Sequence, residues 1–302
     1  MILIRQLLCA SDLSPASAMA WDEARRLARV CQAEIVLLHV LPPILVPPEG
    51  YFPPSLYERL VGAAYADAHE SIDRLLEEQT DPALKVRVRV EEGGPAERIL
   101  DVAREESVDL IIVGTHGRSG LPRLVLGSVA DRVVRQATCP VLTVRPRADG
   151  GTIGRILYAT DFSPTAQAAW PWVAALAEAD GAEVDLLHVT MTAVPGRQMP
   201  PELLGRIAVL LREHGAAQAE GFVREQRELS RDRVHVLIGR GAIAEQIVYW
   251  ARARSADLIV IGTQGWSGLV EWMLGSVAHQ LVQAAPCPLL TVGLIRHGGG
   301  PS

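Results

Sequence analysis

Residues 109–128 read DLIIVGTHGRSGLPRLVLGS, and this stretch decides the fold class of the chain. Its first residues form a short apolar run of the kind that becomes a buried β-strand, and its last residues open a segment with helical spacing. Between them, Gly114, Gly117 and Gly127 follow the pattern G-x2-G-x9-G-S, which ends at Ser128. A strand, a glycine-rich connection and a helix in this order are typical of an α/β fold with a parallel sheet.

The same pattern returns in residues 257–276, which read DLIVIGTQGWSGLVEWMLGS. The agreement continues beyond it, because CPVLTV at 139–144 returns as CPLLTV at 287–292. A repeat of this length is a whole duplicated domain rather than the short unit of a solenoid. The polar, glycine-rich segment RPRADGGT at 145–152 is the natural linker between the two halves. We therefore expect two tandem domains and a short tail, with the bounds 1–147, 151–296 and 297–302.

Each half alternates apolar, strand-like runs with helical patterns. In the first half the expected strands are, in order, ILIRQLLCA, AEIVLLHV, LKVRVRV, VDLIIVG and PVLTV. The expected helices between them are ASAMAWDEARRLARVC, a segment near 55–79, AERILDVAREE and SVADRVVRQ. Ser14-Pro15 and Ser163-Pro164 mark helix starts, because serine is a good N-cap and proline suits the first helical position. The pattern predicts two doubly wound, Rossmann-like α/β domains, each with a five-stranded parallel sheet covered by helices on both faces.

The composition is that of a globular protein, with 49% hydrophobic and 21% charged residues. The formal net charge of −6 argues against a general affinity for nucleic acid. No segment offers about 18 uninterrupted apolar residues, so we expect no membrane span and a soluble, cytoplasmic protein. The four cysteines are far apart and lack metal-ligand spacing, which favours buried free thiols in a reducing compartment.

Ligands of a doubly wound sheet bind beyond the carboxyl ends of its strands, and three kinds of residue fall there in both halves. The first is the connection from Gly114 to Gly127, which is much longer than the usual two to six or so residues. Glycines permit positive φ and let an anion approach the main chain, and the free N–H groups of the following helix favour a phosphate. The structural alternative is tight turns at Gly114 and Gly262 and plain N-caps at Ser128 and Ser276.

The second kind is the acidic residue where the first strand ends, Asp12 and Asp161. A carboxylate there can accept hydrogen bonds from a ribose or base edge, or help to hold a divalent metal beside phosphates. Its structural alternative is turn chemistry before a helix. The third kind is the end of the second strand, Val40 and Val189, whose backbone groups can pair with a base. The histidine before each valine is most simply a core-edge residue with satisfied nitrogens.

Taken together, these residues resemble the universal stress protein family along essentially the whole chain, as two tandem domains. The G-x2-G-x9-G-S pattern is similar to the signature of the family's ATP-binding branch. The resemblance implies that the adenosine of ATP is faced by Asp12 and Val40, and in the second half by Asp161 and Val189. It implies that the phosphates are held by Gly114, Gly117, Gly127 and Ser128, and in the second half by Gly262, Gly265, Gly275 and Ser276.

The resemblance also implies a strand order of 3-2-1-4-5 and pairing through the fifth strand. The fused halves would then form a pseudo-dimer within one chain, and a further homodimer stays open. Mg²⁺ is a candidate companion of the nucleotide, with Asp12 and Asp161 as the carboxylates nearest to it. An unidentified regulatory protein is the expected protein partner.

Efficient catalysis is not evident from the residues. Phosphoryl transfer needs a charge clamp and a positioned base or water, and only His116 and Arg118 stand within the pattern as candidates. Gln264 and Trp266 replace them in the second half, so the two sites are expected to differ. We expect an ATP-binding stress-response regulatory protein with at most weak hydrolysis. Two alternatives stay open: a nucleotide-free stress scaffold that acts by protein–protein contacts, and a slow ATPase.

Overall fold

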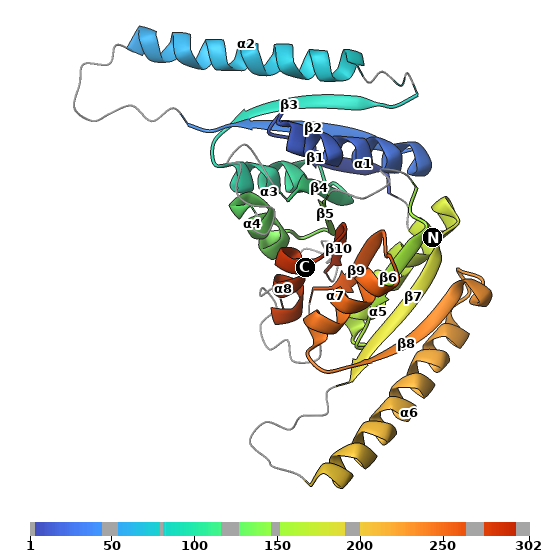
Figure 1. Ribbon diagram of the computed structural model, residues 1–302. Coiled ribbons are helices and arrows are strands. Elements are labelled where there is room, and N and C mark those ends of the chain that lie inside the picture. The colour runs from blue at the N-terminus through green and yellow to red at the C-terminus, as the bar shows by residue number, and fades with distance from the viewer. Residues whose placement is uncertain are drawn as a thin grey trace, which may run out of the picture. The chain divides into compact units, whose positions relative to one another are not determined.

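The computed structural model of the chain describes residues 4–43, 54–78, 81, 83–115, 127–145, 152–190, 200–263 and 275–293. The chain divides into two compact units, which can be followed along the colour scale of Figure 1. The N-terminal unit is Ile4–Ala137, and the C-terminal unit is Thr138–Ser302 together with Met1–Leu3.

The N-terminal unit alternates strands and helices. Its strands are β1 (Gln6–Ala10), β2 (Glu34–Leu41), β3 (Val86–Glu92) and β4 (Leu110–Gly114). Its helices are α1 (Pro15–Cys31), α2 (Pro54–Glu78), α3 (Pro95–Glu105) and α4 (Ser128–Gln136). The strands lie parallel in the order β3-β2-β1-β4. Helix α1 packs on β1 and β4, and α3 packs against α4 (Figure 1).

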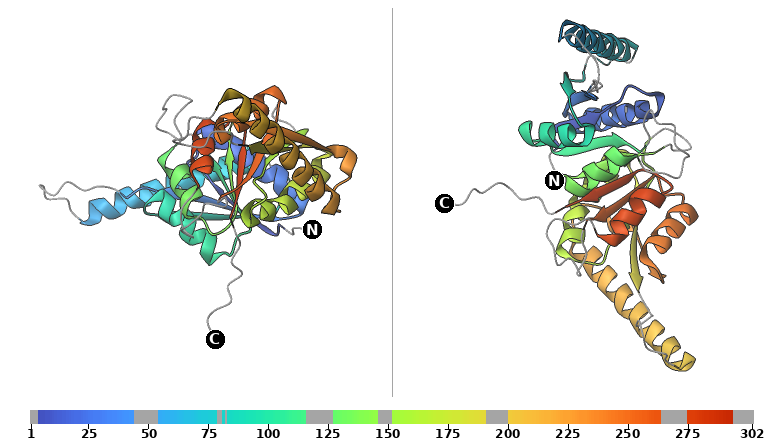
Figure 2. Two further views of the ribbon diagram at one scale, coloured as in Figure 1. Left: turned by 90° about the horizontal axis from the view of Figure 1, so that it is seen from below. Right: turned by 90° about the vertical axis from the view of Figure 1, so that its left-hand side faces the viewer.

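The C-terminal unit repeats this arrangement. Its strands are β5 (Val141–Val144), β6 (Arg155–Ala159), β7 (Glu183–Thr190), β8 (Val234–Arg240), β9 (Leu258–Gly262) and β10 (Leu289–Val292). Its helices are α5 (Pro164–Asp180), α6 (Pro201–Glu225), the 3₁₀ turn η1 (Arg231–Arg233), α7 (Ile243–Ala253) and α8 (Ser276–Ala284). The order β8-β7-β6-β9-β10 confirms the predicted doubly wound 3-2-1-4-5 topology. The second helices of the two units, α2 and α6, have 25 residues each and can be traced in both views of Figure 2.

Strand β5 carries the last residues of the first repeat but pairs with β10, antiparallel. Leu142 lies opposite Leu290, and hydroxyl groups tie the edges, because Thr143 donates to the carbonyl of Leu289 and Thr291 to that of Val141, each at 3.2 Å. The division into compact units therefore falls at 137/138, ahead of the sequence repeat boundary. The predicted linker lies largely outside the described residues, and the domain bounds stay a prediction.

Side chains distant in sequence fix where the first strand of each repeat begins. The Asp109 carboxylate accepts hydrogen bonds from the backbone N–H groups of Arg5 at 2.7 Å and Gln6 at 3.0 Å. Asp257 does the same for Gly154 and Arg155, at 2.8 and 2.9 Å. Strand β1 begins at Gln6, so the described residues Ile4 and Arg5 of the expected strand ILIRQLLCA precede it.

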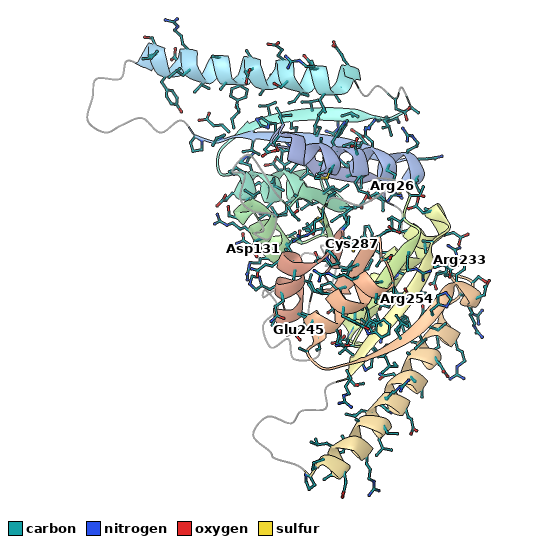
Figure 3. All side chains as sticks on the ribbon, in the orientation of Figure 1. Arg26, Asp131, Arg233, Glu245, Arg254 and Cys287 are labelled. Carbon is teal, nitrogen blue, oxygen red and sulfur yellow. The ribbon has the colours of Figure 1, made fainter. Side chains whose placement is uncertain are left out.

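The predicted helix starts are confirmed. Ser14 and Ser163 are N-caps, and each side chain accepts a hydrogen bond from a backbone N–H of the first turn. A buried ion pair distinguishes the C-terminal unit: Asp185 is fully buried and bonds Arg254, the C-cap residue of α7 (labelled in Figure 3), at 2.9 Å and Arg155 of β6 at 3.2 Å. Val36 occupies the matching position of the first repeat.

All four cysteines are free, as predicted. Cys9 and Cys287 are buried, whereas Cys31 and Cys139 are partly exposed, so the expectation of burial is wrong for that pair. Cys31 is the last residue of α1, and Cys139 lies between α4 and β5. No helix among the described residues is long and apolar enough to cross a membrane.

Candidate functional site

A cavity of about 320 Å³ lies at the carboxyl ends of β1, β2 and β4 in the N-terminal unit. The starts of α3 and α4 close it from the side. This is the position at which doubly wound sheets bind ligands, since β1 lies between β2 and β4 and strand order reverses there. Five residues singled out from the sequence line the cavity: Asp12, Val40, Gly114, Gly127 and Ser128. Gly117, with the rest of 116–126, lies outside the described residues.

The turn after β1 holds Asp12 at the cavity wall. One carboxylate oxygen, Oδ1, accepts hydrogen bonds from the backbone N–H of Ser14 at 3.1 Å and from its hydroxyl at 2.6 Å. Asp12 therefore both stabilises its own turn and lines the cavity. The next residue, Leu13, has a left-handed φ of 59°, and its N–H donates to Oγ of Ser11 at 3.1 Å. The turn directs the chain from β1 into α1 while keeping Asp12 at the strand end.

The backbone N–H and C=O of Val40 point to the side of β2 that pairs with β1, at a level where β1 has already ended. Ala10, the last residue of β1, lies opposite Leu38, and the N–H of Ser11 donates to the Leu38 carbonyl at 2.9 Å. Backbone groups two residues apart in a strand point to the same side. Val40 therefore turns its N–H and C=O past the end of β1, beside the cavity that it lines.

Helix α4 begins at the cavity with a glycine as its N-cap. Gly127 provides no side-chain cap, and Ser128 is the first helical residue. The structural alternative of a plain N-cap at Ser128 is therefore ruled out, and first-turn N–H groups are left without a capping side chain. The φ of Gly127 is −62°, so positive φ does not explain this glycine either. Its N–H donates to the Thr115 carbonyl at 2.9 Å, which joins the end of β4 to the start of α4.

The second repeat reproduces these local arrangements. Asp161 accepts a hydrogen bond from the N–H of Ser163 at 3.0 Å, and Phe162 has a φ of 58°. The N–H of Thr160 donates to the Leu187 carbonyl at 2.9 Å, so Val189, two residues on, turns its backbone past the end of β6.

Helix α8 starts as α4 does. Gly275 is the N-cap without a side-chain cap, with a φ of −58°, and Ser276 is the first helical residue. The N–H of Gly275 donates to the Thr263 carbonyl at 2.8 Å. Gly265 lies outside the described residues. The plain N-cap alternative is therefore ruled out for Ser276 as it is for Ser128.

Gly262, at the end of β9, has a packing reason to be glycine. A Cβ atom built on it would lie 2.8 Å from the backbone nitrogen of Ala166 and 2.9 Å from the carbonyl carbon of Thr165. Both atoms belong to the first turn of α5, so the missing side chain lets the helix approach the strand.

Two segments of the chain, residues 4–145 and 152–293, match the model of the universal stress protein family. The chain belongs to this family. A universal stress protein of Mycolicibacterium smegmatis is 27% identical over 297 residues, which cover 95% of this chain and 96% of that protein. One from Bacillus subtilis is 33% identical over 148 residues, which cover 47% of this chain and all of that protein. The crystal structure of a universal stress protein from Archaeoglobus fulgidus shares the fold with a TM-score of 0.69, at 20% identity, over 97% of this chain and 99% of the other.

In this universal stress protein the histidine of each second strand bonds to the turn after the first strand. Nδ1 of His39 lies 2.8 Å from the Ser11 carbonyl, and Nδ1 of His188 lies 2.9 Å from the Thr160 carbonyl. A carbonyl accepts, so Nδ1 carries the hydrogen and Nε2 of a neutral ring is an acceptor. The predicted satisfied nitrogens are confirmed for Nδ1. For Nε2 of His39, the described residues provide no hydrogen-bond partner.

The sequence did not identify some of the residues that line the site of this universal stress protein. Pro95 and Ile99 of α3 line the first cavity, although no motif marks them. In the C-terminal unit a Cβ on Gly239 would lie 3.2 Å from the Val189 side chain and 3.4 Å from Nε1 of Trp250. The sequence signal that points to this region is the difference between EGGPAERI at 92–99 in the first repeat and GRGAIAEQI at 239–247 in the second. Among the described residues no cluster of three or more His, Cys, Asp or Glu side chains could hold a metal ion.

Proposed function

We propose that this universal stress protein binds ATP at one site per repeat and acts as a stress-response regulator with little or no catalysis. The observation that carries the proposal is the convergence of three features on the 320 Å³ cavity: a carboxylate at Asp12, the turned-out backbone of Val40, and the uncapped start of α4 at Gly127. Each suits a different part of a nucleotide.

The Val40 N–H and C=O offer a donor and an acceptor side by side, which matches the edge of an adenine. The Asp12 carboxylate is tied to its turn through Oδ1, and a carboxylate has enough acceptor sites to accept a further hydrogen bond from a ribose hydroxyl. First-turn N–H groups of α4 favour phosphate through hydrogen bonding and the helix dipole. A site built from backbone groups is compatible with the overall charge of −6.

Mg²⁺ would enter with the nucleotide. Asp12 and Asp161 are the carboxylates that would accompany it, and since the described residues hold no three-group metal cluster, most ligands of the ion would be phosphate oxygens and water. The ion would neutralise part of the triphosphate charge.

The regulatory role, the partner and the cytoplasmic location also belong to this proposal. Pairing of β5 with β10 supports a pseudo-dimer in which the repeats meet through their fifth strands. A slow ATPase is the second candidate, and its test is multiple-turnover release of ADP that falls when His116 or Arg118 is replaced.

The test of binding begins with the nucleotide content of protein purified without added ATP. Gly127→Val and Gly275→Val are expected to remove binding at their own sites, because the added side chains obstruct approach to the helix start. The fold should survive, since both glycines have φ near −60° and a Cβ at Gly127 meets nothing closer than 3.4 Å. Calorimetric titration with ATP measures the sites, and Gly62→Ala, on an open face of α2, is the control. Full two-site binding by the double variant would refute the assignment.

A further inference from the structure

A second cavity, of about 270 Å³, lies between α2 and the ends of β2 and β3 in the N-terminal unit. Its apolar walls include Leu13, Leu41, Ala64, Tyr65 and Ala68. It shares His39, Leu41 and Pro42 with the first cavity, so these residues form a common wall.

The His39 ring presents an acceptor atom, Nε2, at this wall. The residue is only 4% exposed, and its Nδ1 is used by the Ser11 carbonyl. His188 makes the matching Nδ1 bond in the second repeat, so the two rings have the same orientation. There, a Cβ on Gly215 of α6 would lie 2.9 Å from Cδ2 and 3.6 Å from Nε2 of His188. The Cδ2–Nε2 edge thus faces the second helix, which in the N-terminal unit is the helix that lines the cavity.

Aromatic side chains fill the matching space of the C-terminal unit. Phe162 replaces Leu13, and its ring centroid lies 5.0 Å from that of His188 and 5.8 Å from that of Phe222 in α6. Because Gly215 has no side chain, α6 can pack closely against His188. The N-terminal unit lacks the phenylalanine at position 13, and a cavity remains beside its histidine.

The charged groups at the cavity are acidic. Asp67 of α2 and Glu92 of β3 line it, both are exposed side chains, and no Lys or Arg is among its described lining residues. The Tyr57 hydroxyl donates to Oε1 of Glu92 at 3.2 Å, and this hydrogen bond and the Glu92 charge raise the pKa of Tyr57. A ligand here meets apolar walls, the Nε2 acceptor of His39 and two carboxylates.

We propose that this second cavity binds a small amphipathic amine. The apolar body would pack against α2 and Leu13, and its ammonium hydrogens would be donated to Nε2 of His39 and to the carboxylates of Asp67 and Glu92. An organic anion would face two like charges, and a neutral alcohol would leave the carboxylates without a counter-charge. This cavity adjoins the proposed nucleotide site across the shared wall, but the proposal does not depend on nucleotide binding.

Calorimetric titration of the full chain with 2-phenylethylamine, without nucleotide, tests the proposal. 2-Phenylethanol and phenylacetate are the matched neutral and anionic probes. We expect the amine to saturate a single site, the alcohol to bind about tenfold more weakly, and phenylacetate to give no binding heat. No saturable amine binding up to about 10 mM, or equal affinity for the amine and phenylacetate, would overturn the proposal.

Leu13→Phe tests the location, because it introduces the side chain that fills the matching space. Phe162 already adopts the same left-handed φ, so phenylalanine is compatible with the turn. We expect this variant to weaken amine binding by about tenfold or more. Unchanged amine affinity in the folded variant would rule out this cavity.

Asp67→Asn combined with Glu92→Gln tests the charge without altering the walls. We expect the amine to lose about tenfold in affinity while the alcohol keeps its own. Asp73→Asn, an exposed carboxylate elsewhere on α2, is the matched control and should change neither. An equal loss in the control, or an equal loss for amine and alcohol, would contradict a site defined by Asp67 and Glu92.

Discussion

Gly262 and Gly127 show that glycines of one motif can have different physical reasons. A Cβ on Gly262 would press into the backbone of α5, which cannot move aside like a flexible side chain. A Cβ on Gly127 would reach only ordinary contact distance from the Thr115 carbonyl. The first glycine serves helix packing, and the second leaves open space in front of a helix start.

We therefore expect Gly262→Ala to lower the free energy of unfolding by about 1–3 kcal/mol, as overpacking does. Gly127→Ala should change it by less than about 0.5 kcal/mol. Chemical denaturation followed by circular dichroism measures both. Gly62→Ala is the control, because it has open space in a helix and should stabilise slightly. Equal losses for Gly262→Ala and Gly127→Ala would contradict this distinction.

Cysteine reactivity offers a second test at the residue scale. Cys9 is fully buried, and this burial raises its pKa to about 12, so the reactive thiolate is absent near neutral pH. We expect iodoacetamide at about pH 8 to modify Cys31 and Cys139 in the native protein and to spare Cys9 and Cys287. Peptide mass spectrometry reads the sites, and denatured protein, in which all four should react, is the control. Modification of native Cys9 as fast as Cys31 would be inconsistent with its burial.

Asp185 connects elements rather than single residues, since it joins β7 to β6 through Arg155 and to the C-terminal end of α7 through the cap residue Arg254. The hydrogen bond and charge of Asp185 raise the pKa of Arg254. Removing the buried carboxylate would leave two guanidinium groups facing each other without their shared partner.

Asp185→Asn is expected to lower the free energy of unfolding of the C-terminal unit by about 3 kcal/mol. Glu183→Gln is the matched control on the same strand, where an exposed carboxylate pairs with His235, and it should cost less than about 1 kcal/mol. Thermal and denaturant unfolding compare the two variants. Similar losses in the free energy of unfolding would mean that the buried ion pairs of Asp185 stabilise the unit no more than the exposed pair of Glu183.

Helices and strands were predicted correctly from the sequence where the local sequence signals were strong. The helix from Ser128 was predicted to the residue, because a glycine precedes it and apolar spacing continues through it. The start of β1 was not, because it depends on Asp109, which is distant in the sequence. The second cavity was not predicted either, because it depends on whether Leu13 or its counterpart Phe162 fills the space under the second helix.

The candidate site was predicted as a set of positions and not as a geometry. Asp12, Val40 and Gly127 do line one cavity, but the left-handed φ of Leu13 and the N-cap role of Gly127 had to be seen in three dimensions. Pro95 and Ile99 reach the cavity through the packing of α3, which no local pattern encodes.

At the scale of the whole molecule, β5 and β10 decide where the chain can be divided. Residues of β10 are buried, with Leu289 at 0% and Leu290 at 1% exposure, and β5 covers one edge of that strand. A fragment starting at 152 would lose β5 and expose an uncharged, apolar strand edge.

We expect the fragment 152–302 to be less soluble and more aggregated than the full chain at equal concentration. Light scattering and size-exclusion chromatography measure the difference. If 152–302 remained as monodisperse as the full chain, β5 would not be needed to protect β10.

The register of β5 against β10 also has a consequence for ancestry. Leu142 meets Leu290, its own counterpart in the other repeat, and the flanking pairs Thr143–Leu289 and Val141–Thr291 exchange roles around it. Such a pairing is what a two-fold axis through that leucine generates. A single-repeat ancestor with the same strand could associate with a second copy of itself without any new contact. Gene fusion would then have converted a concentration-dependent association into a permanent one.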